Sequence, residues 1–259
     1  MGRVFASSDW HGCGKVANQV LDWLKPDDTL YFIGDAIDRG SDGIAIFDRL
    51  VSRPNTYFIK GNHEAMMAEA LPSIAKEIED PSYYDYEDRD LWYGNGGIKT
   101  VEPLWEKKST EVLEYKRIID KMPLELRYNS PEGHIVILEH AGYSAGSPLR
   151  EHDPLWDRYH FYDKWQGKDN EYLVHGHTPV QYLKFEYGYK EREPLTKKEI
   201  FIKYKWWQEG FYYDPFVIRY CSGHKFDIDL CTIVSGKIGL LDLDTFEEIY
   251  FNEEGEIHE

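Results

Sequence analysis

Five short blocks of polar residues in this sequence each follow a short run of apolar, strand-like residues. The runs are Val4–Ala6, Leu30–Ile33, Tyr57–Ile59, Ile135–Leu138 and Tyr172–Val174. The blocks that follow them are Asp9-Trp10-His11-Gly12, Gly34-Asp35-Ala36-Ile37-Asp38-Arg39-Gly40, Gly61-Asn62-His63-Glu64, His140-Ala141-Gly142 and Gly176-His177-Thr178-Pro179. In parallel α/β sheets, ligands gather at the carboxyl ends of the strands. The repeated order therefore predicts an α/β fold in which residues distant in sequence meet at one site.

The first part of the chain has the pattern of alternating strands and helices. Val16–Leu24 and Ile44–Leu50 lie between the first three apolar runs and carry apolar residues at helical spacing. This order predicts a βαβαβ start. A further helix is expected to begin near Glu64 and to end, or be interrupted, at Pro72.

Two segments depart from this pattern within what we expect to be a single domain of residues 1–259. Residues 72–123 have mostly helical character and an acidic stretch, which favours a solvated cap. Residues 183–225 are rich in Tyr, Trp and Phe and are locally basic. We interpret them as part of a substrate-binding rim, with a satellite hydrophobic cluster as the alternative. The end of the chain predicts three closing antiparallel strands, at Phe226–Val234, Lys237–Asp242 and Glu247–Phe251.

Charge and cysteine content exclude several classes of partner and compartment. The formal net charge of -17 disfavours non-specific binding to nucleic acid or to an anionic membrane, since both attract a basic face. Three cysteines without a disulfide framework indicate free thiols in a reducing compartment. No apolar run is long enough to span a bilayer, so we expect a cytoplasmic protein with no nucleic-acid or membrane partner.

The side chains in the five blocks are of the types that bind divalent metals. They mix carboxylate, imidazole and amide oxygen, a set that suits Mn, Fe or Zn. Two such metals about 3.5–4 Å apart supply a nucleophile and offset charge on phosphoryl oxygens. With Asp9 and Asp35 counted, two dications leave a local charge of about +2, which can attract an anionic substrate to an acidic protein.

Taken together, the five blocks resemble the PPP group of calcineurin-like metallophosphatases, and most closely its small bacterial and bacteriophage Ser/Thr protein phosphatases. The resemblance covers nearly the whole chain outside the two insertions. It implies an α/β/β/α sandwich, in which two sheets are flanked by helices. It also implies hydrolysis of phosphomonoesters in a phosphorylated protein or a small substrate, by direct attack of a hydroxide that bridges two metals. Of the two divalent metal ions, Mn is favoured, with Fe or Zn as alternatives.

The resemblance also implies a role for each residue of the blocks. The first metal takes Asp9, His11 and Asp35, and the second takes Asp35, Asn62, His140 and His177. His63 resembles the general acid that protonates the leaving alkoxide, and Asp38 resembles the carboxylate that orients it. Arg39 and Arg158, the latter in Leu155-Trp156-Asp157-Arg158, resemble the phosphate-binding arginines. Asn95-Gly96-Gly97 also resembles a segment of the phage-type enzymes.

Some alternatives remain open at this stage. His175 could bind metal in a His-Gly-His arrangement, but the phage-type pattern uses only the later histidine, so we predict a supporting role. Lys60 stands where phage members often have arginine, which puts the substrate range in doubt. A dinucleoside polyphosphate hydrolase would share every ligand, although Glu64 in place of Asp favours the protein phosphatases. An inactive phosphate-binding scaffold is the third alternative, and the presence of His63 and Asp38 argues against it.

Overall fold

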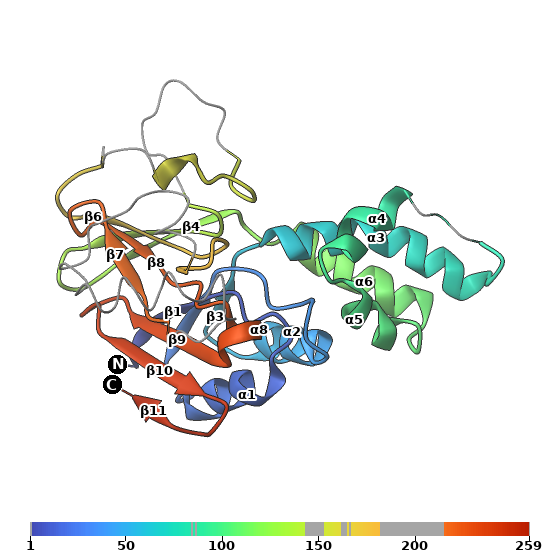
Figure 1. Cartoon of the computed structure of the whole chain (residues 1–259), viewed down its shortest axis with the longest axis horizontal. Coiled ribbons are helices and arrows are strands. Elements are labelled where there is room, and N and C mark those ends of the chain that lie inside the picture. The colour runs from blue at the N-terminus through green and yellow to red at the C-terminus, as the bar shows by residue number, and fades with distance from the viewer. Residues whose placement is uncertain are drawn as a thin grey trace, which may run out of the picture.

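The computed structural model describes residues 2–83, 85, 87–142, 153–161, 165, 167–181 and 215–258. Two mixed β-sheets lie face to face, with helices outside them (Figure 1). The predicted fold, two sheets flanked by helices, is therefore confirmed. Most of the aromatic-rich segment 183–225, up to residue 214, lies outside the described residues.

The first sheet has six strands in the order β11-β10-β9-β1-β2-β3. Its strands are β1 (Val4–Ser7), β2 (Thr29–Phe32), β3 (Thr56–Phe58), β9 (Lys237–Asp242), β10 (Glu248–Asn252) and β11 (Ile257–His258). β1, β2 and β3 are parallel and are connected through α1 (Gly14–Trp23) and α2 (Gly43–Ser52), as the predicted βαβαβ start requires. β9, β10 and β11 are joined to one another in antiparallel order, and β9 pairs with β1.

The second sheet has five strands in the order β4-β5-β6-β8-β7. Its strands are β4 (Glu125–Asn129), β5 (Ile135–Glu139), β6 (Glu171–His175), β7 (Ile218–Tyr220) and β8 (Lys225–Asp227). β5, β6 and β8 run parallel, so the fourth and fifth predicted runs end at the same edge. The short helices η2 (Tyr159–Phe161) and α8 (Thr232–Ser235) lie between strands in the sequence.

The prediction for the closing strands is only partly correct. The antiparallel pair β9 and β10 is confirmed. The stretch Phe226–Val234 is not a third closing strand: its first residues belong to β8 in the other sheet, and its last residues form α8. A short apolar run does not by itself specify which sheet it joins, and here the pairing with β6 decides.

Apolar residues fill the space between the sheets and the space under the helices. Between the sheets, Ala6 and Ile33 belong to one buried cluster with residues of the second sheet such as Val136 and Val174. On the outer face of the first sheet, α1 and α2 bury their apolar faces against strand residues such as Phe32. Burial on both faces explains why parallel strands such as β1 and β5 appear in the sequence as continuous apolar runs.

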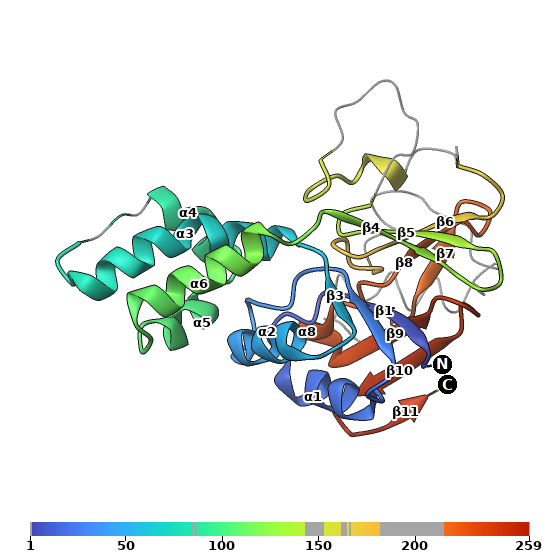
Figure 2. The same ribbon diagram turned by 180° about the vertical axis from the view of Figure 1, so that it is seen from behind.

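The helical insertion forms an arm that extends to one side of the sheets (Figures 1 and 2). Its elements are α3 (Asn62–Glu79), α4 (Glu87–Gly94), α5 (Ile98–Val101), η1 (Glu102–Leu104) and α6 (Ser109–Asp120). The prediction that the helix ends or is interrupted at Pro72 is wrong, because α3 continues through it. Leu71 and Ile74 are buried in the same cluster as Val112 of α6, and this packing outweighs the hydrogen bond that proline removes. In the described part of the chain, no helix is long and apolar enough to cross a membrane.

Candidate metal centre and active site

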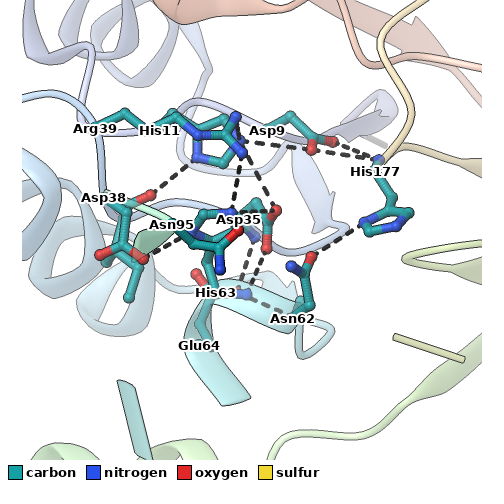
Figure 3. Close-up of polar contacts among 12 residues, drawn as sticks. Asp9, His11, Asp35, Asp38, Arg39, Asn62, His63, Glu64, Asn95 and His177 are labelled. Carbon is teal, nitrogen blue, oxygen red and sulfur yellow. Dashed lines mark hydrogen bonds and ion pairs between the residues drawn. The ribbon is translucent and has the colours of Figure 1, made fainter. Parts of the chain in front are cut away.

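The five predicted blocks meet at the edge where the parallel strands end. Figure 3 shows residues of four of them, and His140 of the fourth block lies 2.9 Å from Asn62 Oδ1. Two of them are joined through their backbones, since the N–H of Asp9 donates to Gly34 O and that of His11 donates to Asp35 O, each at 3.0 Å. The loops after β1 and β2 therefore run side by side. Among the predicted residues at these five strand ends, Arg39 is exposed and the others are buried.

Several site residues have a backbone conformation that side chains usually disfavour. Positive φ angles occur at six of the predicted residues: Asp9, His11, Asp35, Asp38, Arg39 and His177. Each such conformation costs of order 1–3 kcal/mol, and residues of this kind concentrate at functional sites because the surrounding structure holds them there.

Two glycines allow the blocks to come this close. A Cβ atom at Gly61 would lie 2.2 Å from Asp35 Oδ1, and one at Gly176 would lie 2.0 Å from Asp9 Oδ2. Real Cβ atoms do not approach an oxygen so closely, so any larger residue would displace a carboxylate. The glycines of the third and fifth blocks are thus required by packing.

The first group of candidate ligands is centred on His11. Its Nδ1 donates to the Ile37 carbonyl at 3.0 Å, which leaves the lone pair on Nε2. That atom lies 3.9 Å from Asp9 Oδ1 and 3.8 Å from Asp35 Oδ2. Burial, together with the charge of Arg39, holds the pKa of His11 well below its usual range, so the ring is neutral and able to bind a metal.

The second group lies on the other side of Asp35. Ligand atoms of Asp35, His140 and His177 are all within 4.8 Å of one another. Asn62 Oδ1 lies between the two rings, 2.9 Å from His140 Nε2 and 3.0 Å from His177 Nδ1. Burial and the neighbouring His140 lower the pKa of His177, which keeps that ring neutral.

The contacts of His140 test whether these residues fit a cation. Its Nδ1–H donates to Ile33 O at 2.8 Å, so a neutral ring directs the Nε2 lone pair at Asn62 Oδ1 and at Asp35 Oδ1, 3.4 Å away. Burial would lower the pKa of His140, but Asp35 and Asp9 raise it to about 10. The lone pairs of His140 Nε2, Asn62 Oδ1 and Asp35 Oδ1 thus converge on one point, where a positive charge is stabilised. A divalent metal supplies that charge, and the donor set fits one.

His63 and Asp38 form a buried pair beside these groups. His63 Nδ1 lies 2.7 Å from Asp38 Oδ2, and the ring packs edge-on against His11 with centroids 4.7 Å apart. Burial opposes protonation of His63, but the charge of Asp35 and the contact with Asp38 raise its pKa overall. A raised pKa favours the protonated form of the ring, which a proton donor requires.

The two predicted arginines lie on different sides of the site. Arg39 extends its guanidinium to His11 Nε2 at 2.8 Å and to His63 Nε2 at 3.1 Å (Figure 3). Arg158 donates from Nε to Thr178 Oγ1 at 3.1 Å, next to the loop that carries His177. A guanidinium at each position can bind the oxygens of a phosphoryl group.

His175 does not point a free nitrogen at the metal ligands. Its Nε2 bonds the hydroxyl of Tyr220 at 2.7 Å, and its Nδ1 lies 3.0 Å from Gly176 O. Burial lowers the pKa of His175 to about 3, so it is a neutral core histidine. This agrees with the supporting role expected for it.

The contacts of three residues of the site were not predicted from the sequence. Glu64 accepts hydrogen bonds from backbone N–H groups at the ends of β2 and β3, and Trp92 and Thr100 bond the carboxylate of Asp38. Glu64 stands three residues after Gly61, the N-cap of α3, where a capping glutamate is common, so the sequence did contain this signal. Trp92 and Thr100 belong to the arm. The interpretation of residues 72–123 as a solvated cap therefore left out the contacts that the arm makes with the site.

Comparison with known proteins agrees with this architecture. A crystal structure described as a putative diadenosine tetraphosphatase covers 97% of this chain and 94% of its own, at a TM-score of 0.57 and 17% identity. The match to the crystal structure of the cold-active protein-tyrosine phosphatase of a psychrophilic Shewanella species covers 100% of this chain and 80% of that one, at a TM-score of 0.54 and 15% identity. At such low identities these two likenesses concern the fold alone.

Sequence comparison extends the likeness to a curated relative. Serine/threonine-protein phosphatase 2 of Escherichia coli (strain K12) is 26% identical over 133 residues. The match takes in 50% of this chain and 54% of the relative, so the chain spans about half the length of that protein.

The profile of one protein family matches most of the chain. It is described as calcineurin-like phosphoesterase, and the match runs over residues 2–236, which include every predicted site residue. The resemblance seen in the five blocks is thereby confirmed. The chain belongs to the calcineurin-like phosphoesterase family.

Proposed function

We propose that this chain is a metal-dependent phosphomonoester hydrolase that acts as a Ser/Thr protein phosphatase, with dual specificity as an extension. The observation that carries the proposal is that two buried groups of potential ligand atoms share Asp35. One group consists of His11, Asp35 and His63, and the other of Asp35, His140 and His177. The N–H of His63 donates to Asp35 Oδ1 at 3.1 Å, so the proposed acid and the proposed bridging ligand are adjacent.

The proposed metal ligands divide between two positions. Asp9, His11 and Asp35 would hold the first ion, and Asp35, Asn62, His140 and His177 would hold the second. Two divalent ions there would supply a nucleophile from water and offset the charge on the phosphoryl oxygens. Mn is the ion we favour, with Fe and Zn as alternatives, because carboxylate, imidazole and amide ligands suit all three.

Four other side chains carry the remaining chemistry in this proposal. Arg39 and Arg158 bind phosphoryl oxygens and stabilise the charge that they carry in the transition state. His63 donates a proton to the leaving oxygen, so that an alkoxide does not have to leave unprotonated. Asp38 accepts from Nδ1 of His63, which fixes the ring and directs its Nε2 into the site.

A dinucleoside polyphosphate hydrolase is the second candidate. It would use the same ligands and differ in the walls around them, and the whole-chain likeness to a putative diadenosine tetraphosphatase keeps it under consideration. Phosphotyrosine is a third substrate to compare, given the likeness to a protein-tyrosine phosphatase. An inactive phosphate-binding scaffold is disfavoured, because the candidate ligands, His63 and Asp38 are all present and in contact.

A substrate panel tests the proposal. Protein stripped of metal and then supplied with Mn is assayed on phosphoserine and phosphotyrosine peptides, an aryl phosphate and diadenosine tetraphosphate. We expect the phosphoserine peptide to be hydrolysed with a higher kcat/KM than the dinucleotide. A preference for the dinucleotide would replace the proposal with its second candidate. Tight phosphate binding without turnover of any substrate would favour the scaffold.

A further inference from the structure

The carboxylate of Asp38 is held from two sides, and one of them is the helical arm. Trp92 of α4 donates its indole N–H to Asp38 at 2.9 Å from Oδ2 and 3.0 Å from Oδ1. Thr100 of α5 donates its hydroxyl to Oδ1 at 2.6 Å. The remaining contact, from His63 Nδ1 to Oδ2, is the one that the proposed mechanism uses. Asp38, Trp92 and Thr100 are each completely buried, so water does not compete for these bonds.

The hydroxyl of Thr100 makes a closed pair of bonds with Asp38. It accepts from the backbone N–H of Asp38 at 2.9 Å while it donates to the carboxylate of the same residue. A hydroxyl has one proton, so accepting from the N–H leaves that proton for Oδ1. Thr100 therefore fixes both the backbone and the side chain of Asp38.

The backbone at this point needs such support. Asp38 and Arg39 have φ angles of 72° and 66°, a conformation that costs free energy for residues with a side chain. The arm supplies the bonds that hold both residues: Thr100 holds Asp38, and Gly96 O accepts from the N–H of Arg39 at 3.1 Å. The strained turn is thus stabilised by a segment more than 50 residues further along the chain.

This arrangement explains why two glycines occur in the Asn95-Gly96-Gly97 segment. Gly96 has a φ of 103°, which favours glycine. A Cβ at Gly97 would lie 2.6 Å from ring atoms of Trp92, so glycine there lets the indole reach Asp38. The turn between α4 and α5 is shaped to bring Trp92 and Thr100 to the same carboxylate.

We infer that Trp92 and Thr100 are positioning residues, through which the arm orients the Asp38–His63 pair for proton donation. The inference rests on the proposed function, in which His63 is the general acid. Because His63 Nδ1 has Asp38 as its acceptor, a fixed carboxylate fixes the plane of the ring and the direction of Nε2. The arm is then part of the catalytic apparatus and not only a cover.

Conservative variants of Thr100 test this by kinetics. Thr100→Val keeps the shape and removes both bonds, whereas Thr100→Ser keeps the hydroxyl. We expect Thr100→Val to lower kcat on a phosphoserine peptide by about 10–100-fold, the loss typical of a residue that orients a functional side chain. KM should change little. The kcat on an activated aryl phosphate should fall less, because its leaving group departs with little protonation. Thr100→Ser should retain most of the wild-type rate. Trp92→Phe, which removes only the N–H, should act in the same direction.

Matched variants separate positioning from loosening of the arm. Tyr115 of α6 donates to Asp48 of α2 at 3.1 Å, so Tyr115→Phe removes a bond between the arm and the rest of the protein that does not reach Asp38. Tyr115→Phe should leave kcat unchanged on both the phosphoserine peptide and the aryl phosphate. In a His63→Asn background, Thr100→Val should cause no further loss on the phosphoserine peptide. The inference would be overturned if Thr100→Val lowered kcat equally on both substrates, or if Thr100→Ser had a kcat no higher than Thr100→Val.

A spectroscopic readout does not depend on turnover. The ¹⁵N–¹H signal of His63 Nδ1, assigned by its loss in His63→Asn, reports the bond to Asp38 directly. We expect Thr100→Val to shift or broaden this signal, and Thr100→Ser and Tyr115→Phe to leave it in place. An unchanged signal in Thr100→Val contradicts the inference even if the enzyme is active. If the wild-type protein hydrolyses nothing in the panel, the proposed function fails, and this signal alone decides whether the arm holds the ring.

Discussion

The side chain of Glu64 accepts a hydrogen bond from the backbone N–H of Asp35, the residue of the candidate bridging carboxylate, at 2.8 Å (both residues are labelled in Figure 3). The same side chain accepts from Ala36 N at 2.9 Å and from Gly61 N at 3.0 Å. Glu64 is completely buried, so water does not substitute for it. It joins the loop after β2 to the start of α3 and holds Asp35 in its left-handed conformation.

Replacing Glu64 with alanine should therefore be costly. Glu64→Ala leaves three buried N–H groups without their acceptor, and we expect the free energy of unfolding to fall by at least about 2 kcal/mol. Urea denaturation of the metal-free protein measures the loss. Glu69 is exposed on the same helix, and Glu69→Ala should stay within about 0.5 kcal/mol of the wild type. Similar values for the two variants would show that the three bonds add no stability.

Local pattern was sufficient to predict the parallel strands. β1 and β5 are buried almost throughout, and β2, β3 and β6 each bury at least one face, so each appears in the sequence as a short apolar run. The blocks after them could be linked to one site because parallel strands end at one edge. The positions of the ligands relative to one another, such as Asn62 Oδ1 between two imidazoles, come from the fold and not from the spacing.

Long-range packing explains what the sequence did not predict. Trp92 looks like an ordinary core residue of an amphipathic helix, and nothing near it in sequence indicates a bond to Asp38, 54 residues earlier. Pro72 reads as a helix end, yet α3 continues because Leu71 and Ile74 are buried in the arm. β8 could not be assigned to the second sheet without knowing that β6 is its neighbour.

Removal of metal should abolish hydrolysis. We expect chelator-treated protein to be inactive and added Mn to restore the rate, since the two ligand groups need a cation to satisfy their lone pairs. Asp35→Asn should reduce kcat/KM by several orders of magnitude while circular dichroism shows a folded protein, because Asp35 belongs to both groups. Near-normal turnover by thoroughly stripped protein would contradict the proposed function as a whole.

Loss of His63 should depend on the leaving group. A general acid contributes about 10²–10⁴ in rate, and His63→Asn should lose most of that on an alkyl phosphate such as phosphoserine. The leaving group of an activated aryl phosphate departs with little protonation, so the rate of its hydrolysis should fall less. Parallel measurement of kcat/KM on both substrates gives the comparison. Equal losses would mean that His63 positions metal or phosphate and does not donate a proton.

The two arginines should each contribute to binding of the phosphoryl group in the transition state. A hydrogen bond to a charged group contributes about 1.5–3 kcal/mol, so Arg39→Ala and Arg158→Ala should each lower kcat/KM by the corresponding factor. Inorganic phosphate should also inhibit both variants less, because the product presents the same oxygens. Arg117 is exposed on α6 and pairs with Glu114, so Arg117→Ala serves as the control and should leave both measurements unchanged. An Arg158→Ala variant with wild-type kcat/KM would remove Arg158 from the phosphate site and leave its bond to Thr178 as its only described role.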